Sequence, residues 1–190
     1  MERDLEHLSD EELLGRFVEG TKDAFAVLMR RHEDRVFGIA LRMTGDRGDA
    51  LDATQDAFIH AFRRARSFRG DAAFGTWLYR IAINSCHDVL RRRARAPIPK
   101  EDLPEEPTGG GDDERAAARI DLSAALALLQ EDYRTAVVMH DLGGIPYEQI
   151  AHETGVSIGT VKSRISRGRR RLAALLEQTG GELPSQESTT

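Results

Sequence analysis

The sequence contains a single cysteine, Cys86, among its 190 residues. One cysteine cannot form an internal disulfide and cannot supply a multi-cysteine zinc site. Cys86 lies in an apolar stretch with helical spacing, which predicts a small core residue. The chain also lacks a run of about 18 apolar residues, as a membrane-spanning helix requires, and its acidic start does not resemble a secretory signal. These absences lead us to expect a cytoplasmic protein without an integral membrane segment.

Motifs of nucleic-acid enzymes and metal centres are also absent from the sequence. The six histidines are scattered singly, and no His-Glu-x-x-His motif, cysteine cluster or Walker-type glycine loop occurs. The carboxylates lie beside arginines on amphipathic segments, as is typical of solvated helix faces. We therefore expect no catalytic residue, no metal ligand and no cofactor, and we do not expect an enzyme.

The net charge of −5 does not by itself predict a nucleic-acid partner, but the distribution of charge does. Residues 97–114 hold seven acidic side chains and one basic side chain, whereas residues 162–171 hold six basic side chains and no acid. A second basic cluster covers residues 91–95. Local clusters determine the field that a phosphate experiences within the Debye length. The two basic clusters are therefore candidate contacts to nucleic acid.

Apolar residues recur with helical periodicity almost throughout, and no strand pattern competes with it. The sequence predicts an all-α protein with two small helical domains, residues 1–95 and 115–179. Between them, residues 96–114 combine four prolines, three consecutive glycines and seven acids, a composition typical of a flexible linker. Residues 180–190 are expected to form a disordered tail.

The most informative pattern is a helix-turn-helix over residues 147–172. Gly155 stands where the helices must turn, because glycine adopts positive φ at little steric cost, and Ser157 is a suitable N-cap for the second helix. One arc of that helix is apolar, and the opposite arc holds Thr160, Lys162, Ser163, Ser166, Arg167 and Arg170. Such side chains can reach base edges in a major groove. The alternative is a solvated basic helix that only packs on its apolar side.

A second pattern lies within residues 68–95. Projected as a helix from Phe74, one arc is apolar, and the other holds Trp77, Arg80, Asn84, His87 and Arg91. Aromatic faces stack on unpaired bases, arginine holds the backbone, and asparagine can read a base edge. The stripe therefore suits single-stranded DNA or a base taken out of the stack. The alternative makes Trp77 a boundary core residue and Asn84 an ordinary surface residue.

A third pattern lies on a helix expected to begin near Asp49 and to end near Ser67. One side of this helix holds Ala50, Ala57, Phe58 and Ala61, and the other holds Asp52, Gln55, Asp56, Ile59 and Arg63. An apolar residue within a charged rim is typical of a protein interface. Single exposed isoleucines are also common on surfaces without a partner, so the pattern alone leaves both interpretations open.

In this order and spacing, the three segments resemble the extracytoplasmic-function (ECF) group of sigma factors of bacterial RNA polymerase. The resemblance extends from about Asp10 to Leu176 and rests on residues 49–58, on Phe68-Arg-Gly-Asp with residues 74–84, and on residues 159–165. It implies a subunit that binds core RNA polymerase, directs it to specific promoters and promotes strand opening. Polymerase would supply the chemistry.

The resemblance also implies roles for individual residues. Core polymerase would be bound by Asp52, Gln55, Asp56 and Ile59. Single-stranded −10 DNA would be contacted by Phe68, Arg69, Gly70, Asp71, Trp77, Tyr79, Arg80, Asn84, Arg91, Arg92 and Arg93. Duplex −35 DNA would be read by Thr160, Lys162, Ser163, Ser166, Arg167 and Arg170. An anti-sigma factor is a further implied partner, and we expect a monomer when the protein is free.

A stand-alone helix-turn-helix transcriptional regulator is the main alternative function. Such a regulator would be expected as a homodimer that reads two half-sites about one helical turn apart. The linker and the stripe of Trp77, Arg80 and Asn84 fit that function poorly. Sedimentation of the free protein would distinguish the two, because the sigma interpretation expects a monomer.

Overall fold

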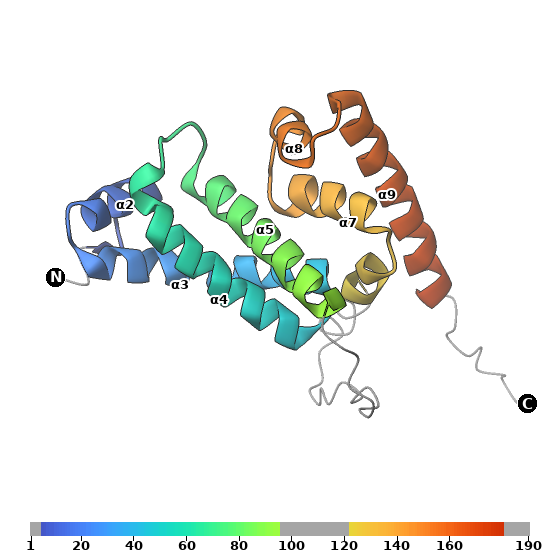
Figure 1. Cartoon of the computed structure of the whole chain (residues 1–190), viewed down its shortest axis with the longest axis horizontal. Helices are drawn as coiled ribbons and strands as arrows, with labels where there is room; N and C mark the ends of the chain where they lie inside the picture. Colours follow the sequence, from blue (N-terminus) through green and yellow to red (C-terminus); the bar gives the residue numbers. More distant parts are fainter. Residues whose placement is uncertain (1–4, 96–121, 181–190) are drawn as a thin grey trace, which may run out of the picture.

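The computed structural model describes residues 5–95 and 122–180, and the regular structure in these two ranges is helical. The predicted all-α class is therefore confirmed. The predicted linker, residues 96–114, and residues 181–190 of the predicted tail lie outside the described residues, whereas residue 180 is the last residue of a helix. Among the helices of these two ranges, none combines the length and the apolarity that crossing a bilayer requires. The N-terminal lobe (5–95) and the C-terminal lobe (122–180) lie side by side (Figure 1).

The N-terminal lobe is built from α2 (Asp10–Val18), α3 (Lys22–Thr44), α4 (Arg47–Arg64), the 3-10 helix η1 (Ala65–Ser67) and α5 (Phe74–Arg95). α2 begins with a capping box. The Ser9 side chain accepts a hydrogen bond from the Glu12 backbone N–H (3.2 Å), and the Glu12 carboxylate accepts one from the Ser9 N–H (2.8 Å). Gly45 ends α3 in the left-handed conformation, with φ 71°.

A face of small residues joins α4 to the helices on either side of it. Ala50, Ala53, Ala57 and Ala61 are fully buried, and α4 packs against both α3 and α5. The predicted two-sided character of this helix is therefore confirmed. Because the alanine face is committed to the core, the opposite face of α4 remains on the surface.

The C-terminal lobe consists of a helical segment at 122–127, α7 (Glu131–Val137), the π-helix η2 (Val138–Leu142), α8 (Tyr147–Thr154) and α9 (Ile158–Gly180). The contact between α7 and α9 is close at Gly168. A Cβ atom there would lie 2.6 Å from Val137 Cγ2, so a larger residue would force the two helices apart. α9 also packs against α8, which forms the other half of the helix-turn-helix.

The two lobes contact each other through α3 and α5 on one side and the C-terminal helices on the other. The Arg35 guanidinium of α3 donates to the Leu142 carbonyl oxygen at the end of η2 (2.8 Å). Where α3 ends, a Cβ atom at Gly45 would lie 2.9 Å from Ala127 Cβ. This packing brings η2 of the C-terminal lobe against α5 as well as α3.

Candidate nucleic-acid interface

The helix-turn-helix has the local geometry that its sequence predicts. Gly155 follows α8 in the left-handed conformation, with φ 67°, and the Ser157 hydroxyl accepts a hydrogen bond from the Thr160 backbone N–H (3.1 Å). Val161 and Ile165 are buried and fix one side of α9 against the lobe. The polar arc of α9 consequently points outward.

The polar arc of α9 is open to solvent. Ser163 is half-buried, and the exposed members are Thr160, Lys162, Ser166, Arg167 and Arg170. The Lys162 ammonium lies 5.5 Å from the centre of the Tyr147 ring, which gives it a cation–π contact. Within residues 5–95 and 122–180, neither Arg167 nor Arg170 forms an ion pair, so both guanidinium groups are available to a partner.

The two arcs predicted for α5 are also present. Leu78 and Ala82 are buried in the N-terminal core. The opposite side carries Trp77, Arg80, Asn84, His87 and Arg91, which range from partly to fully exposed. This side of α5 therefore lies outside the N-terminal core, as the sequence predicts.

The C-terminal lobe contacts part of this stripe, an arrangement that the sequence did not predict. The Arg80 guanidinium forms an ion pair with the Glu153 carboxylate of α8. His87 Nδ1 lies 3.0 Å from Glu131 Oε1 of α7. Asn84 lies between them and borders a hollow of about 260 Å³ that both lobes line. In this arrangement Arg80 and His87 of the candidate single-strand face are paired with the C-terminal lobe, which lies beside α5 (Figure 1), whereas Asn84 and Arg91 remain exposed.

Aromatic rings hold the loop that precedes α5. The ring centroids of Phe68 and Trp77 are 5.3 Å apart, and those of Trp77 and Phe74 are 5.6 Å apart. Phe74 is buried, whereas Arg69, Gly70 and Asp71 are exposed at the tip of the loop. The predicted loop residues are thus displayed on an aromatic base that α5 supplies.

Tyr79 is the predicted strand-contact residue that the structure places elsewhere. Its side chain is buried (8% exposed), its hydroxyl lies 3.0 Å from His32 Nδ1, and burial raises the pKa of the phenol. An enclosed ring offers no face on which a base could stack, so we correct its expected role to an interior one. At about 100° per residue, Tyr79 falls near the apolar arc of α5, a signal that could have prevented the error.

The arginines at the end of α5 already hold carboxylates of α4. The Arg92 guanidinium donates to Asp56 (2.8 Å), and the Arg93 guanidinium donates to Asp49 (2.7 Å). These hydrogen bonds raise the pKa values of both arginines, which remain charged. A phosphate that approaches this end of α5 would therefore compete with the protein's own carboxylates.

The exposed side of α4 forms an apolar groove with α3. The groove measures about 580 Å³, and its lining includes the predicted residues Asp52, Gln55 and Ile59 together with Met29, Leu51 and Phe62. Leu51 and Phe62 are 51% and 48% exposed. Sequence reasoning missed these two residues, although they share the helical face of Gln55 and Ile59. Asp56 lies outside this lining because its carboxylate points toward α5.

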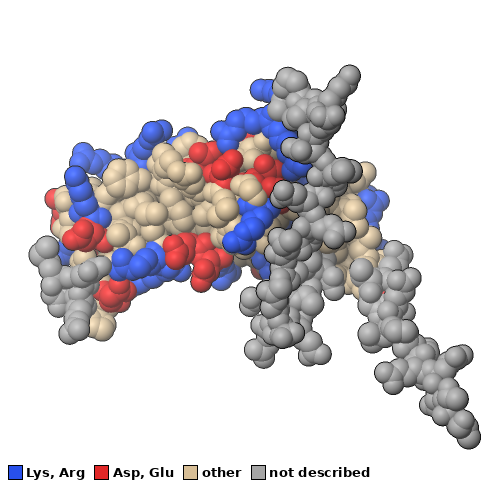
Figure 2. Space-filling model, turned by 90° about the horizontal axis from the view of Figure 1, so that it is seen from below, with Lys and Arg blue, Asp and Glu red and all other residues tan. Residues whose placement is uncertain are grey.

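Phenylalanine rings from three helices support the groove at one end. Phe62 contacts Phe17 of α2 and Phe25 of α3, with centroid separations of 4.9 and 5.1 Å. Seen from below Figure 1, the N-terminal lobe shows a band of uncharged surface with charged side chains along both edges (Figure 2). An apolar centre with a charged rim is the composition expected of a protein-binding surface.

Two family models match the chain, one in each lobe. The model described as Sigma-70 region 2 matches residues 28–96, and the model described as Sigma-70, region 4 matches residues 119–172. The first contains α4 and α5, and the second contains the helix-turn-helix. The candidate faces therefore lie within the matched ranges.

Curated relatives match along most of the chain. The RNA polymerase sigma-H factor of Pseudomonas aeruginosa is 37% identical over 182 residues, which cover 88% of this chain and 94% of the relative. The ECF RNA polymerase sigma-E factor of Haemophilus influenzae is 38% identical over 178 residues (86% and 93% covered). The ECF RNA polymerase sigma factor SigM of Mycobacterium tuberculosis is 43% identical over 169 residues (88% and 85% covered).

Solved structures share the fold. CnrH in complex with the cytosolic domain of CnrY aligns with a TM-score of 0.63 at 27% identity, over 89% of this chain and 97% of that chain. The sigma factor RpoE of Bartonella quintana, in complex with the anti-sigma factor NepR, aligns with a TM-score of 0.61 at 28% identity, over 80% and 96%. Both lobes, the helix-turn-helix and the relatives agree with one conclusion: the chain belongs to the extracytoplasmic-function group of RNA polymerase sigma factors, which bind core polymerase and start transcription at promoters.

Proposed function

We propose that three surfaces of this sigma factor divide the work of promoter-directed initiation. The groove between α3 and α4 binds core RNA polymerase, the stripe on α5 binds the separated −10 strand, and the polar arc of α9 reads the −35 duplex. The observation that carries the proposal is that the Trp77–Asn84 side of α5 lies outside the N-terminal core while its opposite side fills that core. Residues 96–114 serve as the tether between the lobes.

The groove suits a helical partner on polymerase because its centre is apolar and Asp52 and Gln55 stand at its edge. Ile59 and Phe62 supply the apolar contact area. RpoE of Bartonella quintana was solved with an anti-sigma factor. We therefore propose that an anti-sigma factor of this protein covers the same groove and so excludes polymerase.

The stripe on α5 acts by preferring separated strands over duplex. Asn84 carries both a donor and an acceptor for the edge of an unstacked base. Trp77 and Phe68 offer aromatic surface, and Arg91, Arg92 and Arg93 hold the backbone. Because α5 faces the C-terminal lobe, the lobes must separate before DNA can bind there. Polymerase drives this separation when it binds the two lobes at different places.

The protein itself supplies no catalytic group in this mechanism. Its family consists of transcription initiation factors, and strand opening requires only a difference in affinity between the separated and the paired DNA. We place its action in the cytoplasm, where its polymerase partner works.

Asn84→Ala tests the base-reading role. We expect open-complex formation at a cognate promoter to fall by about 5- to 150-fold, the range for losing a bidentate base contact. Association with core polymerase should not change, because the groove lies on α3 and α4. Gln55→Ala is the reciprocal control and should weaken core association without altering −10 base discrimination. Equal losses of core binding and of opening in Asn84→Ala would contradict the proposal.

A further inference from the structure

We infer that Asp10, His32 and Tyr79 form a hydrogen-bonded relay that positions the start of α5 for reading the −10 strand. The three are positioning residues, since none of them lies on the DNA-facing side of α5. This inference rests on the proposed −10 role of α5. It assigns a task to α2, which precedes the part of the chain that the Sigma-70 region 2 model matches.

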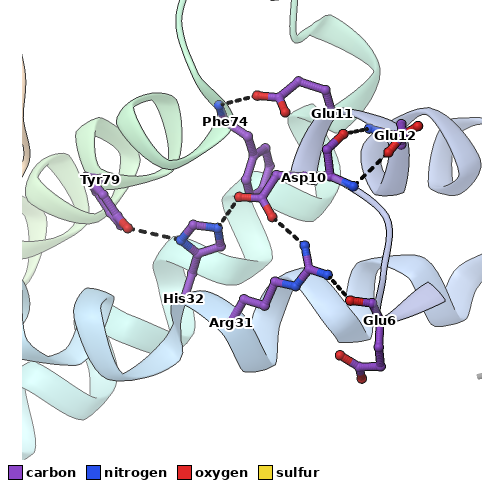
Figure 3. Close-up of polar contacts among 9 residues, drawn as sticks. Glu6, Asp10, Glu11, Glu12, Arg31, His32, Phe74 and Tyr79 are labelled. Carbon is purple, nitrogen blue, oxygen red and sulfur yellow. Dashed lines mark hydrogen bonds and ion pairs between the residues drawn. The ribbon is translucent and has the colours of Figure 1, made fainter. Parts of the chain in front are cut away.

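Three helices meet at one imidazole ring. His32 of α3 places its Nε2 atom 2.7 Å from Asp10 Oδ2 of α2 and its Nδ1 atom 3.0 Å from the Tyr79 hydroxyl of α5 (Figure 3). The His32 side chain is 12% exposed, and its ring meets the Phe74 ring edge to face, with centroids 5.5 Å apart. The His32–Tyr79 end of the relay therefore lies inside the lobe, whereas the Asp10 side chain is 24% exposed.

The chemistry of the three groups fixes the direction of the relay. The Asp10 carboxylate can only accept, so the proton of a neutral imidazole lies on Nε2. Nδ1 then accepts a hydrogen bond from the Tyr79 hydroxyl, whose raised pKa keeps it protonated. The other carboxylate oxygen of Asp10 accepts from Arg31 (3.0 Å). Arg31 thereby holds the Asp10 end of the relay, and the hydrogen bond to His32 fixes the position of the Tyr79 hydroxyl at the other end.

A second contact ties α2 to the first residue of α5. A carboxylate oxygen of Glu11 accepts a hydrogen bond from the Phe74 backbone N–H, with 3.4 Å between the oxygen and the nitrogen (Figure 3). This N–H is at the start of the helix and has no acceptor within α5. There is also no spare room at this point, because a Cβ atom at Gly75 would lie 3.3 Å from His32 Cε1. The start of α5 is thus fixed from two sides.

This anchoring acts directly on the DNA-reading loop. Phe74 contacts both Phe68 and Trp77, so a shift at the start of α5 displaces the aromatic base that carries residues 69–71. Apolar contacts alone tolerate small rotations and slides, whereas hydrogen bonds are directional. A polar relay in an otherwise apolar core is therefore suited to holding the loop and Asn84 in register with each other.

Tyr79→Phe and Asp10→Asn test the relay with changes that keep size and shape. Each variant should reduce open-complex formation on a duplex promoter by about 2- to 10-fold, as expected from one hydrogen bond. Fork-junction probes that differ at single −10 bases should be discriminated less well. Core association should stay near that of the unaltered protein. The double variant should lose less than the product of the single losses, because both act through His32.

Glu6→Gln is the matched control, since it neutralises a carboxylate in an exposed ion pair with Arg30 beside the same helix. Unchanged opening and discrimination in both relay variants would overturn the inference. Losses of core association equal to the losses of opening would also overturn it, because they would mark a general structural role. If Asn84→Ala retains full base discrimination, the proposed −10 role of α5 fails instead. If Asn84→Ala loses base discrimination but the relay variants do not, only the inferred role of the relay is rejected.

Discussion

The two helices that we propose as DNA contacts differ in how many of their arginines form ion pairs. On α9, Arg167 and Arg170 are exposed and form no ion pair within the described ranges. On α5, Arg80 is paired with Glu153 of the other lobe, and Arg92 is paired with Asp56 of α4. The proposed face for duplex DNA therefore keeps these two arginines unpaired before polymerase binds, whereas the proposed face for separated strands has arginines paired with the protein's own carboxylates.

This difference suits the order in which the two DNA forms exist. Duplex −35 DNA is always present, but separated −10 strands form only in the polymerase complex. The pairs that cover α5 are partly exposed, and such pairs contribute about 0.2–1 kcal/mol each. Pairs of this strength limit contacts between α5 and DNA in the free protein. Polymerase can still break them by binding the two lobes at separate places.

A disulfide between the lobes gives the largest expected effect. Cysteines in place of Gly45 and Ala127 would place their Cβ atoms 2.9 Å apart. A disulfide needs about 3.5–4.5 Å between these atoms, so the bond forms after the two segments move apart by roughly an ångström. When this bond forms, we expect promoter opening in run-off and permanganate assays to be lost, because α5 stays covered. Binding of a −35 duplex by the free protein should not change.

The native cysteine should not compete for this bond. Cys86 is buried, as predicted, and burial raises its pKa to about 12, so it holds almost no thiolate at neutral pH. Addition of a reductant should restore opening, and Gly45→Cys alone controls for strain at a left-handed position. If the oxidised double variant opens promoters as well as the reduced form does, the lobes need not separate, and α5 does not have to be freed from the C-terminal lobe before it binds DNA.

Arg167→Ala tests the open face and should have the next largest effect. If Arg167 binds a guanine through two hydrogen bonds, its loss should reduce discrimination of the −35 sequence by about 1–3 kcal/mol. The measurement is run-off transcription by holoenzyme on promoters with single −35 substitutions. A uniform loss across all sequences would mark a phosphate contact instead.

Arg169→Ala is the matched control on the same helix. Its guanidinium is bound to Asp141 of η2, away from the predicted reading arc. This variant should retain −35 discrimination even if the stability of the lobe falls. Equal effects of the two substitutions would mean that α9 contributes only positive charge, and the distinction between a reading face and a basic helix would disappear.

The features that could be predicted from the sequence are those set by near neighbours in the chain. The Ser9–Glu12 capping box, the turn at Gly155 and the alanine face of α4 each depend on residues within a few helical turns. The two faces of α5 and the outward arc of α9 follow from the same periodicity. These features were enough to establish the fold class and to select most candidate residues.

The features that could not be predicted depend on residues far apart in the chain. Arg80 and Glu153 are 73 positions apart, and His32 and Tyr79 are 47 positions apart. Helical periodicity reports which side of a helix is apolar, but it does not report which helix packs on the other side. The covered stripe and the interior place of Tyr79 therefore required the tertiary structure.

Glu153→Gln should have the smallest effect, and it tests whether the ion pair with Arg80 helps to hold the two lobes together. The substitution keeps the size of the side chain and removes the charge that holds Arg80, so the population of separated lobes should rise. Since a partly exposed pair contributes about 0.2–1 kcal/mol, free protein should bind a single-stranded −10 oligonucleotide about 1.5- to 5-fold more tightly. Fluorescence energy transfer between dyes on the two lobes should fall in parallel.

Glu148→Gln controls for the change of charge on the same helix, because Glu148 is exposed on α8 and forms no ion pair within the described lobes. It should leave single-strand affinity and energy transfer unchanged. Tighter binding by Glu153→Gln without a change in lobe separation would mean that the carboxylate repels DNA rather than holding Arg80. In that case α5 and α9 would differ only in local charge. Polymerase would then not need to separate the lobes before α5 binds DNA.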